Sequence, residues 1–276
     1  MFKIVTDSSS NMRSMEKTAF ASAPLKIVTD EREFVDTETL DVLEMVEYLK
    51  GYKGRSGSAC PSSDDWLSAF GDAQYVFCIA ITSHLSGSYN SARLAAEDYM
   101  EQHPDRKVFV IDSLSTAGEM QLIAERIEAL IEKGLSFEEI CSAVTEYMKK
   151  THLLFCLESL TNLVNNGRVS AAAAKISGLL NLRIVGKASD QGELEMLDKS
   201  RGDKGGRASI VKNMKDMGYE GGRVIIGHCA AKERAHLLAD AIRAEFAEAD
   251  ISIGENGGLC SFYAENGGLL VGFESK

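Results

Sequence analysis

The chain has 276 residues, enough to bury one large or two medium hydrophobic cores. Its composition, 45% apolar and 26% charged, is that of an ordinary globular protein. The formal net charge of −11 argues against a nucleic-acid partner, because binding to phosphates needs a basic surface. No apolar run reaches the length of a membrane span, and the first residues form no signal segment, so we expect a cytoplasmic protein without stable membrane insertion.

The six cysteines include no CxxC pair, and three of them lie inside apolar runs. A free thiol in such a run behaves as a small hydrophobic group. We therefore expect reduced, buried cysteines rather than a disulfide framework or a zinc site.

The first half of the chain alternates between short apolar runs and helical patterns. Helices are expected at about 40–49 (with Thr37 as N-cap), 64–70, 118–133 and 136–149, with a loop over 51–63. Strands are expected at 2–6, 23–28, 32–35, 76–81 and 107–111. This alternation is typical of an α/β fold with a mostly parallel sheet and helices on both faces.

Polar turns follow three of these strands, at residues 7–10, 82–88 and 112–115. Ligands of such sheets collect beyond the carboxyl ends of the strands, where these turns lie. The turn at 82–88 is rich in Ser, Thr and Gly and leads into a helical pattern, so its hydroxyls and the first backbone N–H groups of the helix converge. This strand–turn–helix unit predicts a site for the carboxylate or phosphate of a small molecule.

The second half has a different pattern, with a mixed or antiparallel sheet and helices as the expectation. Helices are expected at 160–164, 170–180, up to about 217 and at 232–246. Strands are expected at 153–157, 182–187, 192–198, 224–227, 259–263 and 269–273, the last two bounded by repeated Asn-Gly turns. We place a domain boundary near residue 150, giving an N-terminal α/β domain at 1–150 and a C-terminal α/β domain at 151–276.

Ser86, with Gly87 beside it, is the leading candidate for ligand binding. A helix N-cap needs only one such serine, and the turn holds more hydroxyls than capping requires. Gly87 would let a ligand or another backbone come close. Ser58 lies in a second Ser-rich segment, which is either a plain polar turn or the source of a second hydroxyl for the same anion. The sequence HLSGS around Ser86 does not match the GxSxG elbow of hydrolases, so a nucleophilic serine is not favoured.

Other polar residues leave two alternative functions open. Asp7 and Asp112 end strands, where an aspartate either caps the next segment or takes part in chemistry. An enzyme acting on a phosphorylated or acylated small molecule would use these residues or Ser86. His228 ends an apolar strand and either faces a cleft or is structural. Basic residues gather between positions 165 and 207, as a solvated face or as a docking surface of an interaction protein.

Seven short motifs occur in an order that is specific to one family. They are TDS (6–8), a Pro-Leu step (24–25) before a strand that ends in Asp36, SACPS (58–62), LSGSY (85–89) with Ser-Ala at 91–92, DSLS (112–115), NGR (166–168) and KxRxxK (199–204). Over about residues 2–275 the chain thus resembles the DegV family of fatty-acid-binding proteins.

The resemblance implies a two-domain α/β protein that holds one long-chain fatty acid in a buried tunnel. Ser58 and Ser86 would hydrogen-bond the carboxyl group, and the protein would catalyse nothing and need no cofactor or metal. Some members present the bound acid to a separate fatty-acid kinase, and Arg168 and Arg201 look like residues near that partner surface.

This chain departs from the family pattern in two places. Position 58 is Ser where the family has Thr, and Cys60 stands where it has Gln. The late HxGPG element of the family is replaced by AENGG at 264–268, which lacks the His. The resemblance therefore implies ligand binding more strongly than delivery to a kinase.

Overall fold

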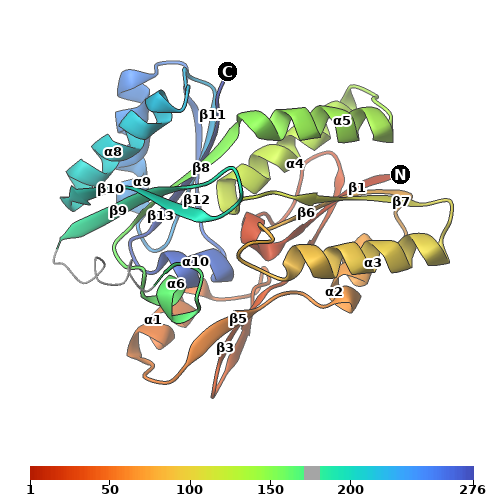
Figure 1. The fold of residues 1–276 in the computed structure, drawn as a ribbon, viewed down its shortest axis with the longest axis horizontal. Coiled ribbons are helices and arrows are strands. Elements are labelled where there is room, and N and C mark those ends of the chain that lie inside the picture. Colours follow the sequence, from red (N-terminus) through yellow and green to blue (C-terminus); the bar gives the residue numbers. More distant parts are fainter. Residues whose placement is uncertain (171–180) are drawn as a thin grey trace.

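The computed structural model describes residues 1–170 and 181–276, which form three sheets with their helices (Figure 1). The first sheet has the strand order β2-β1-β6-β7, and all its strand pairs are parallel. Its strands are β1 (Phe2–Asp7), β2 (Ala19–Ala23), β6 (Tyr75–Ala80) and β7 (Lys107–Asp112). The prediction of a parallel N-terminal sheet is confirmed.

Helices cover both faces of this sheet, because successive residues of a buried strand point to opposite sides. Val76 and Cys78 of β6 pack with the core under α2 (Ser63–Phe70) and α3 (Ser88–Gln102). Phe77 and Ile79 pack with the opposite core, under α4 (Ala117–Glu132) and α5 (Phe137–Tyr147). Two short 3-10 helices, η1 (Ser8–Ser10) and η2 (Met148–Lys150), complete this half.

The second sheet has six strands in the order β10-β9-β8-β13-β11-β12. It is antiparallel except for the β11–β12 pair at one edge, so the expected mixed sheet is confirmed. Its strands are β8 (Thr151–Leu157), β9 (Leu182–Ala188), β10 (Leu194–Arg201), β11 (Arg223–His228), β12 (Asp250–Glu255) and β13 (Leu269–Glu274). One face is covered by α8 (Gly202–Asp216) and α9 (Lys232–Glu245).

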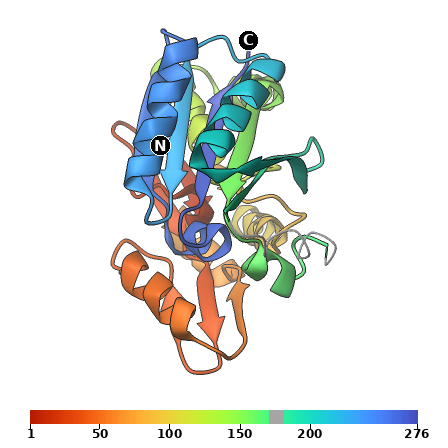
Figure 2. The same ribbon diagram turned by 90° about the vertical axis from the view of Figure 1, so that its left-hand side faces the viewer.

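Helix α4 also packs against the other face of the second sheet, so it lies between the two large sheets (Figures 1 and 2). The contact is close: a Cβ added at Gly118 would lie 2.8 Å from the carbonyl oxygen of Ile225 and 2.9 Å from the amide nitrogen of Gly272. Because α4 belongs to both cores, the division into domains near residue 150 stays a prediction.

A small antiparallel sheet, β4-β3-β5, was not predicted. It consists of β3 (Lys26–Thr29), β4 (Glu33–Val35) and β5 (Ser56–Ala59), with α1 (Val42–Gly51) packed against it. The strand expected at 23–28 is in fact two strands, β2 and β3, that belong to different sheets. The chain leaves the first sheet at Pro24, which has no N–H to continue the ladder. The loop expected at 51–63 was also wrong, because it contains β5.

Two further corrections concern the helices. The predicted strand at 259–263 is the helix α10 (Gly258–Ala264), and α1 is capped by Asp41 rather than Thr37. The short α6 (Thr161–Asn165) matches the helical turn expected at 160–164. The helix expected at 170–180 falls almost wholly outside the described residues. Among the residues that the structure describes, no helix combines the length and apolarity needed to cross a bilayer.

The small sheet and α10 form one structural unit below the large sheets in Figure 2. The Asp36 carboxylate, buried just after β4, accepts hydrogen bonds from the amides of Gly258 (2.7 Å) and Leu259 (2.9 Å). Phe262 packs into the core between α1 and β3. These contacts hold α10 as a helix against a segment more than 200 residues away in the chain, and they position one wall of the cavity described next.

Candidate functional site

An apolar cavity lies where the two large sheets, the small sheet and α10 meet. Its volume is about 60 Å³, or about 640 Å³ when all the empty space between its walls and the part open to solvent are counted. Most of its wall is hydrocarbon. The lining residues are Leu25, Ser58, Ile81, Leu85, Ser86, Thr116, Leu153, Phe155, Leu157, Leu163, Arg168, Leu194, Leu259, Cys260, Tyr263, Ala264 and Leu270. A neighbouring hollow with a mixed polar and apolar wall shares Leu85, Phe155, Leu163, Arg168 and Leu194 with it, so the open space extends along the second sheet.

Ser58 enters this cavity from β5. Its position is set by pairing with Ile27 in the small antiparallel sheet. The side chain of Asn166 donates a hydrogen bond to the carbonyl of Ser56 (3.3 Å) and so ties the start of β5 to the residues after α6. The Ser58 hydroxyl lies 2.7 Å from the Tyr263 hydroxyl on α10. Ser58 is therefore fixed at the cavity wall by both its backbone and its side chain.

Ser86 reaches the same cavity from the turn between β6 and α3. Its Oγ accepts a hydrogen bond from the backbone N–H of Ser88 (3.2 Å), which leaves the hydroxyl hydrogen of Ser86 free to donate to a ligand. The structure thus places both predicted serines in the wall of one cavity. Their direct role in ligand binding stays a prediction.

Gly87 does not line the cavity. It is the N-cap residue of α3, and a Cβ added there would lie 3.3 Å from the Cys60 sulfur. The close approach at Gly87 is therefore between two loops of the protein, and it brings the segment after Ser58 against the segment after Ser86. A ligand contact at Gly87 stays a prediction.

Asp7 supports the Ser86 turn from beneath. It is fully buried at the end of β1 and accepts hydrogen bonds from the Ile81 amide (2.9 Å) and the Ser88 hydroxyl (2.6 Å), and from the amide (3.2 Å) and hydroxyl (2.5 Å) of Ser9. Burial raises the pKa of Asp7, and these hydrogen bonds offset part of that rise. With its oxygens occupied by four donors, Asp7 positions the turn and is not exposed to a substrate.

Asp112 has a similar role at the end of β7. Its Oδ1 accepts hydrogen bonds from the backbone N–H groups of Ser83 and Leu114, both at 3.1 Å. The Thr82 hydroxyl donates to the carbonyl of Gly192 (2.9 Å), which links the turn to the β9–β10 connection. The polar turns that the sequence singled out thus hold one another in place around Ser86.

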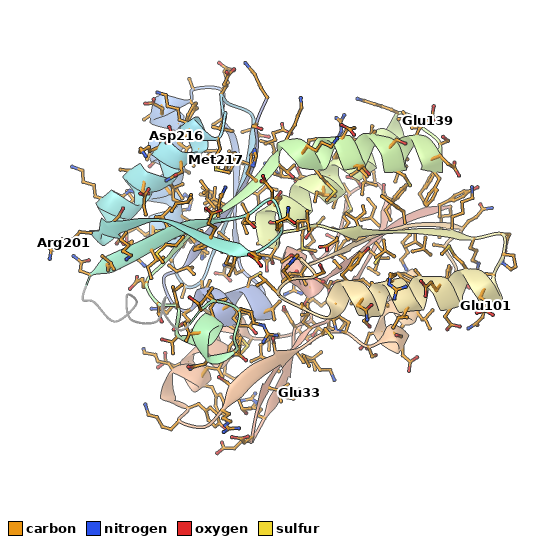
Figure 3. All side chains as sticks on the ribbon, viewed as in Figure 1. Glu33, Glu101, Glu139, Arg201, Asp216 and Met217 are labelled. Carbon is orange, nitrogen blue, oxygen red and sulfur yellow. The ribbon has the colours of Figure 1, made fainter. Side chains whose placement is uncertain are left out.

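The two arginines of interest lie in different settings. Arg168 lines the cavity, and its Nε donates to the carbonyl of Leu85 (3.1 Å), next to Ser86. Arg201 is exposed at the outer end of β10, at the edge of the molecule in Figure 3. A docking role for either residue stays a prediction.

The remaining basic residues between 165 and 207 are not one uniform solvated face. Arg183 is buried and forms ion pairs with Asp203 (2.8 Å) and Glu158 (3.2 Å), and Arg234 of α9 pairs with the same two carboxylates. This network joins β8, β9, α8 and α9, so Arg183 stabilises the second sheet and its helices instead of facing a partner.

His228 is also structural. It is buried at the end of β11, its Nδ1 accepts a hydrogen bond from the Ala231 amide (3.4 Å), and it lies outside the cavity wall. Burial lowers the pKa of its imidazole, which favours the neutral form that such an acceptor needs. Within the described part of the chain, no three metal-binding side chains lie together.

Sequence reasoning missed three polar residues of the cavity, namely Thr116, Cys260 and Tyr263. Two of them are on α10, which the sequence pattern presented as a strand. No local signal connects Tyr263 with Ser58, because the two residues are 205 positions apart and meet only through the packing of α10 on the small sheet.

Three comparisons with known proteins agree. A model of the DegV family, described as an uncharacterised protein family, matches residues 1–276. A DegV domain-containing protein of Streptococcus pneumoniae (strain R6) is 46% identical over 277 residues, 99% of each chain.

Solved structures of relatives superpose over the whole chain. A DegV family protein from Eubacterium eligens loaded with heptadecanoic acid is 42% identical, with a TM-score of 0.98 over 100% of both chains. The Streptococcus pneumoniae Fatty Acid Kinase (Fak) B3 protein loaded with linoleic acid is 46% identical, with a TM-score of 0.97 over 100% of this chain and 99% of that one. With its sequence and its fold matched from end to end, the chain belongs to the DegV family.

Proposed function

We propose that this protein binds a long-chain fatty acid in the apolar cavity, with the carboxyl group at Ser58 and Ser86. One observation carries the proposal: the hydroxyls of Ser58 and Ser86, from separate elements, lie in the wall of one cavity whose surface is mostly hydrocarbon. The fatty-acid-loaded relatives, at 42% and 46% identity, support the same ligand class.

The expected energetics agree with such a ligand. Burying a chain of about 15 methylene groups contributes about 12 kcal/mol before the cost of association, at about 0.8 kcal/mol per group. The head group then has to be oriented rather than held tightly. Neutral hydroxyls do this without the desolvation penalty of a buried ion pair.

We infer a carrier role rather than catalysis. Asp7 and Asp112, two of the three residues that an enzyme would have used, accept hydrogen bonds from the protein's own groups, Asp7 from amides and hydroxyls and Asp112 from two amides. Four of the six cysteines are buried, as expected of reduced thiols that pack as small hydrophobic groups, whereas Cys60 is exposed and Cys141 half-buried; we propose a cytoplasmic site of action. The relative named as a fatty-acid kinase B3 protein supports presentation of the bound acid to a kinase subunit. Arg168, at the cavity, and Arg201, at the surface, are the proposed docking residues.

The ligand is tested by mass spectrometry of lipid extracted from the purified protein, together with titration of added long-chain acids. A protein that carries no lipid and binds none of the added acids would refute the proposal.

The head-group site is tested with Ser86→Ala. We expect affinity for the acid to fall by about 1–3 kcal/mol, because a buried carboxylate oxygen loses its donor. Ser83→Ala is the matched control, since Ser83 is exposed in the same turn and does not line the cavity. Equal affinities of the two variants would place the head group elsewhere.

The docking role is tested with Arg201→Ala in an assay that follows phosphorylation of the bound acid by a fatty-acid kinase subunit. We expect slower phosphorylation with unchanged affinity for the acid. Unchanged phosphorylation would exclude Arg201 from the docking surface.

A further inference from the structure

Tyr263 is one of the three polar side chains of the cavity that the sequence patterns did not connect with the head-group site. Its hydroxyl lies 2.7 Å from the Ser58 hydroxyl, and both residues line the cavity. The Tyr263 ring is held by packing: it stacks edge-on against Phe262 with ring centroids 4.8 Å apart. The Asn162 side chain also donates to the carbonyl of Phe262 (2.7 Å), which fixes this turn of α10.

We propose that Tyr263 is a positioning residue that orients the Ser58 hydroxyl toward the ligand carboxylate, an inference that rests on the proposed function. A serine has three staggered rotamers, whereas the extra methyl group of a threonine restricts the side chain. Position 58 lacks that methyl group in this chain. The hydrogen bond to Tyr263 supplies the missing restraint from outside the residue.

Either hydroxyl can donate in this pair, and we assign the donor role to Tyr263. Each hydroxyl has one hydrogen, and only one hydrogen can lie between the two oxygens. A carboxylate accepts but does not donate, so one hydroxyl must direct its hydrogen to the ligand while the other supports it. With Tyr263 donating to Ser58, the Ser58 hydrogen is free for the carboxylate. Such a chain of hydrogen bonds also polarises the terminal donor and strengthens it.

The test measures affinities for a long-chain acid and for its methyl ester in four proteins: wild type, Tyr263→Phe, Ser58→Ala and the double variant. Tyr263→Phe keeps the ring and removes only the hydroxyl. We expect it to weaken acid binding about tenfold and to change ester binding by less than twofold, because the ester has no charged acceptor. In the Ser58→Ala background, the Tyr263 substitution should have little further effect.

Two further variants separate positioning from a general structural role. Tyr99→Phe is the matched control, because the Tyr99 hydroxyl bonds only to the protein, with the carbonyls of Gly71 and Ala73 at 2.8 Å and the Arg106 side chain at 2.9 Å. It should leave the preference for acid over ester unchanged. Ser58→Thr, added to Tyr263→Phe, should recover at least part of the lost affinity, since the methyl group restores the restraint.

The outcomes are distinct. Two results would overturn the positioning role and leave the proposed function standing, provided that the wild type binds the acid. In the first, the affinity of Tyr263→Phe for the acid is within twofold of wild type. In the second, the Tyr263 substitution lowers this affinity as much in the Ser58→Ala background as in wild type. If the wild type binds no long-chain acid, the proposed function fails and this inference fails with it.

Discussion

Glu119 makes the stability of this protein depend on pH in the neutral range. It lies in the first turn of α4, between the two large sheets, and is only 6% exposed. One carboxyl oxygen is 2.8 Å from the Thr151 hydroxyl at the start of β8. Burial raises the pKa of Glu119 from 4.5 to about 7, and hydrogen bonds to hydroxyls offset part of the rise.

The sign of the effect follows from proton binding. Between pH 4.5 and about 7 the folded protein keeps a proton on Glu119 that the unfolded chain has lost. Stability therefore falls as pH rises through this interval. At the upper end, the ionised carboxylate costs about 3 kcal/mol of unfolding free energy. The variant Glu119→Gln is a neutral, nearly isosteric substitute that does not titrate and can still hydrogen-bond to Thr151.

We compare the free energies of unfolding of Glu119→Gln and wild type. The difference should grow in favour of the variant by about 2 kcal/mol as pH rises from 5.5 to 8. Urea unfolding at several pH values measures this difference directly. Glu101→Gln is the control, because Glu101 is exposed at the end of α3 (Figure 3). The stability difference between this variant and wild type should not change with pH. If the stability difference between Glu119→Gln and wild type is also independent of pH, the reasoning is refuted. The Glu119 carboxyl would then titrate alike in the folded and unfolded chains.

Two substitutions test the packing around the cavity. Gly118→Ala should destabilise by about 1–3 kcal/mol, because its Cβ would lie 2.8 Å from the carbonyl oxygen of Ile225 and neither backbone can yield easily. Asp36→Ala should cost about 2–4 kcal/mol, because two buried amides of α10 lose their acceptor, and it should weaken fatty-acid binding as α10 loosens. Urea unfolding and a fatty-acid titration measure these effects.

Each of these variants has a matched control. Gly51→Ala should leave stability nearly unchanged. Gly51 lies at the end of α1, and no atom lies within 4 Å of the added Cβ. Asp41→Ala removes the exposed N-cap of α1 and should cost only about 1 kcal/mol with no effect on fatty-acid binding. Equal losses within either pair would contradict the packing that the structure shows.

Much of the fold could be predicted from local patterns. The alternation of apolar runs and helical periodicity predicted the parallel sheet with helices on both faces, and the polar turns predicted where a ligand site would gather. Ser86, which lines the cavity, could be predicted as a candidate because a strand followed by a hydroxyl-rich turn and a helix is a local arrangement. Signals of this kind depend on neighbours within a few residues, and a single chain is enough to show them.

Only the tertiary structure decided the features that depend on distant contacts. The segment at 259–263 has the turns and apolar residues of a strand, and it is a helix because Asp36, more than 200 residues earlier, accepts hydrogen bonds from its first amides. The same packing places Tyr263 against Ser58. Propensity is weak compared with buried hydrogen bonds and core contacts. The sequence by itself therefore determined the class of fold and one side of the site, and long-range packing determined the other side.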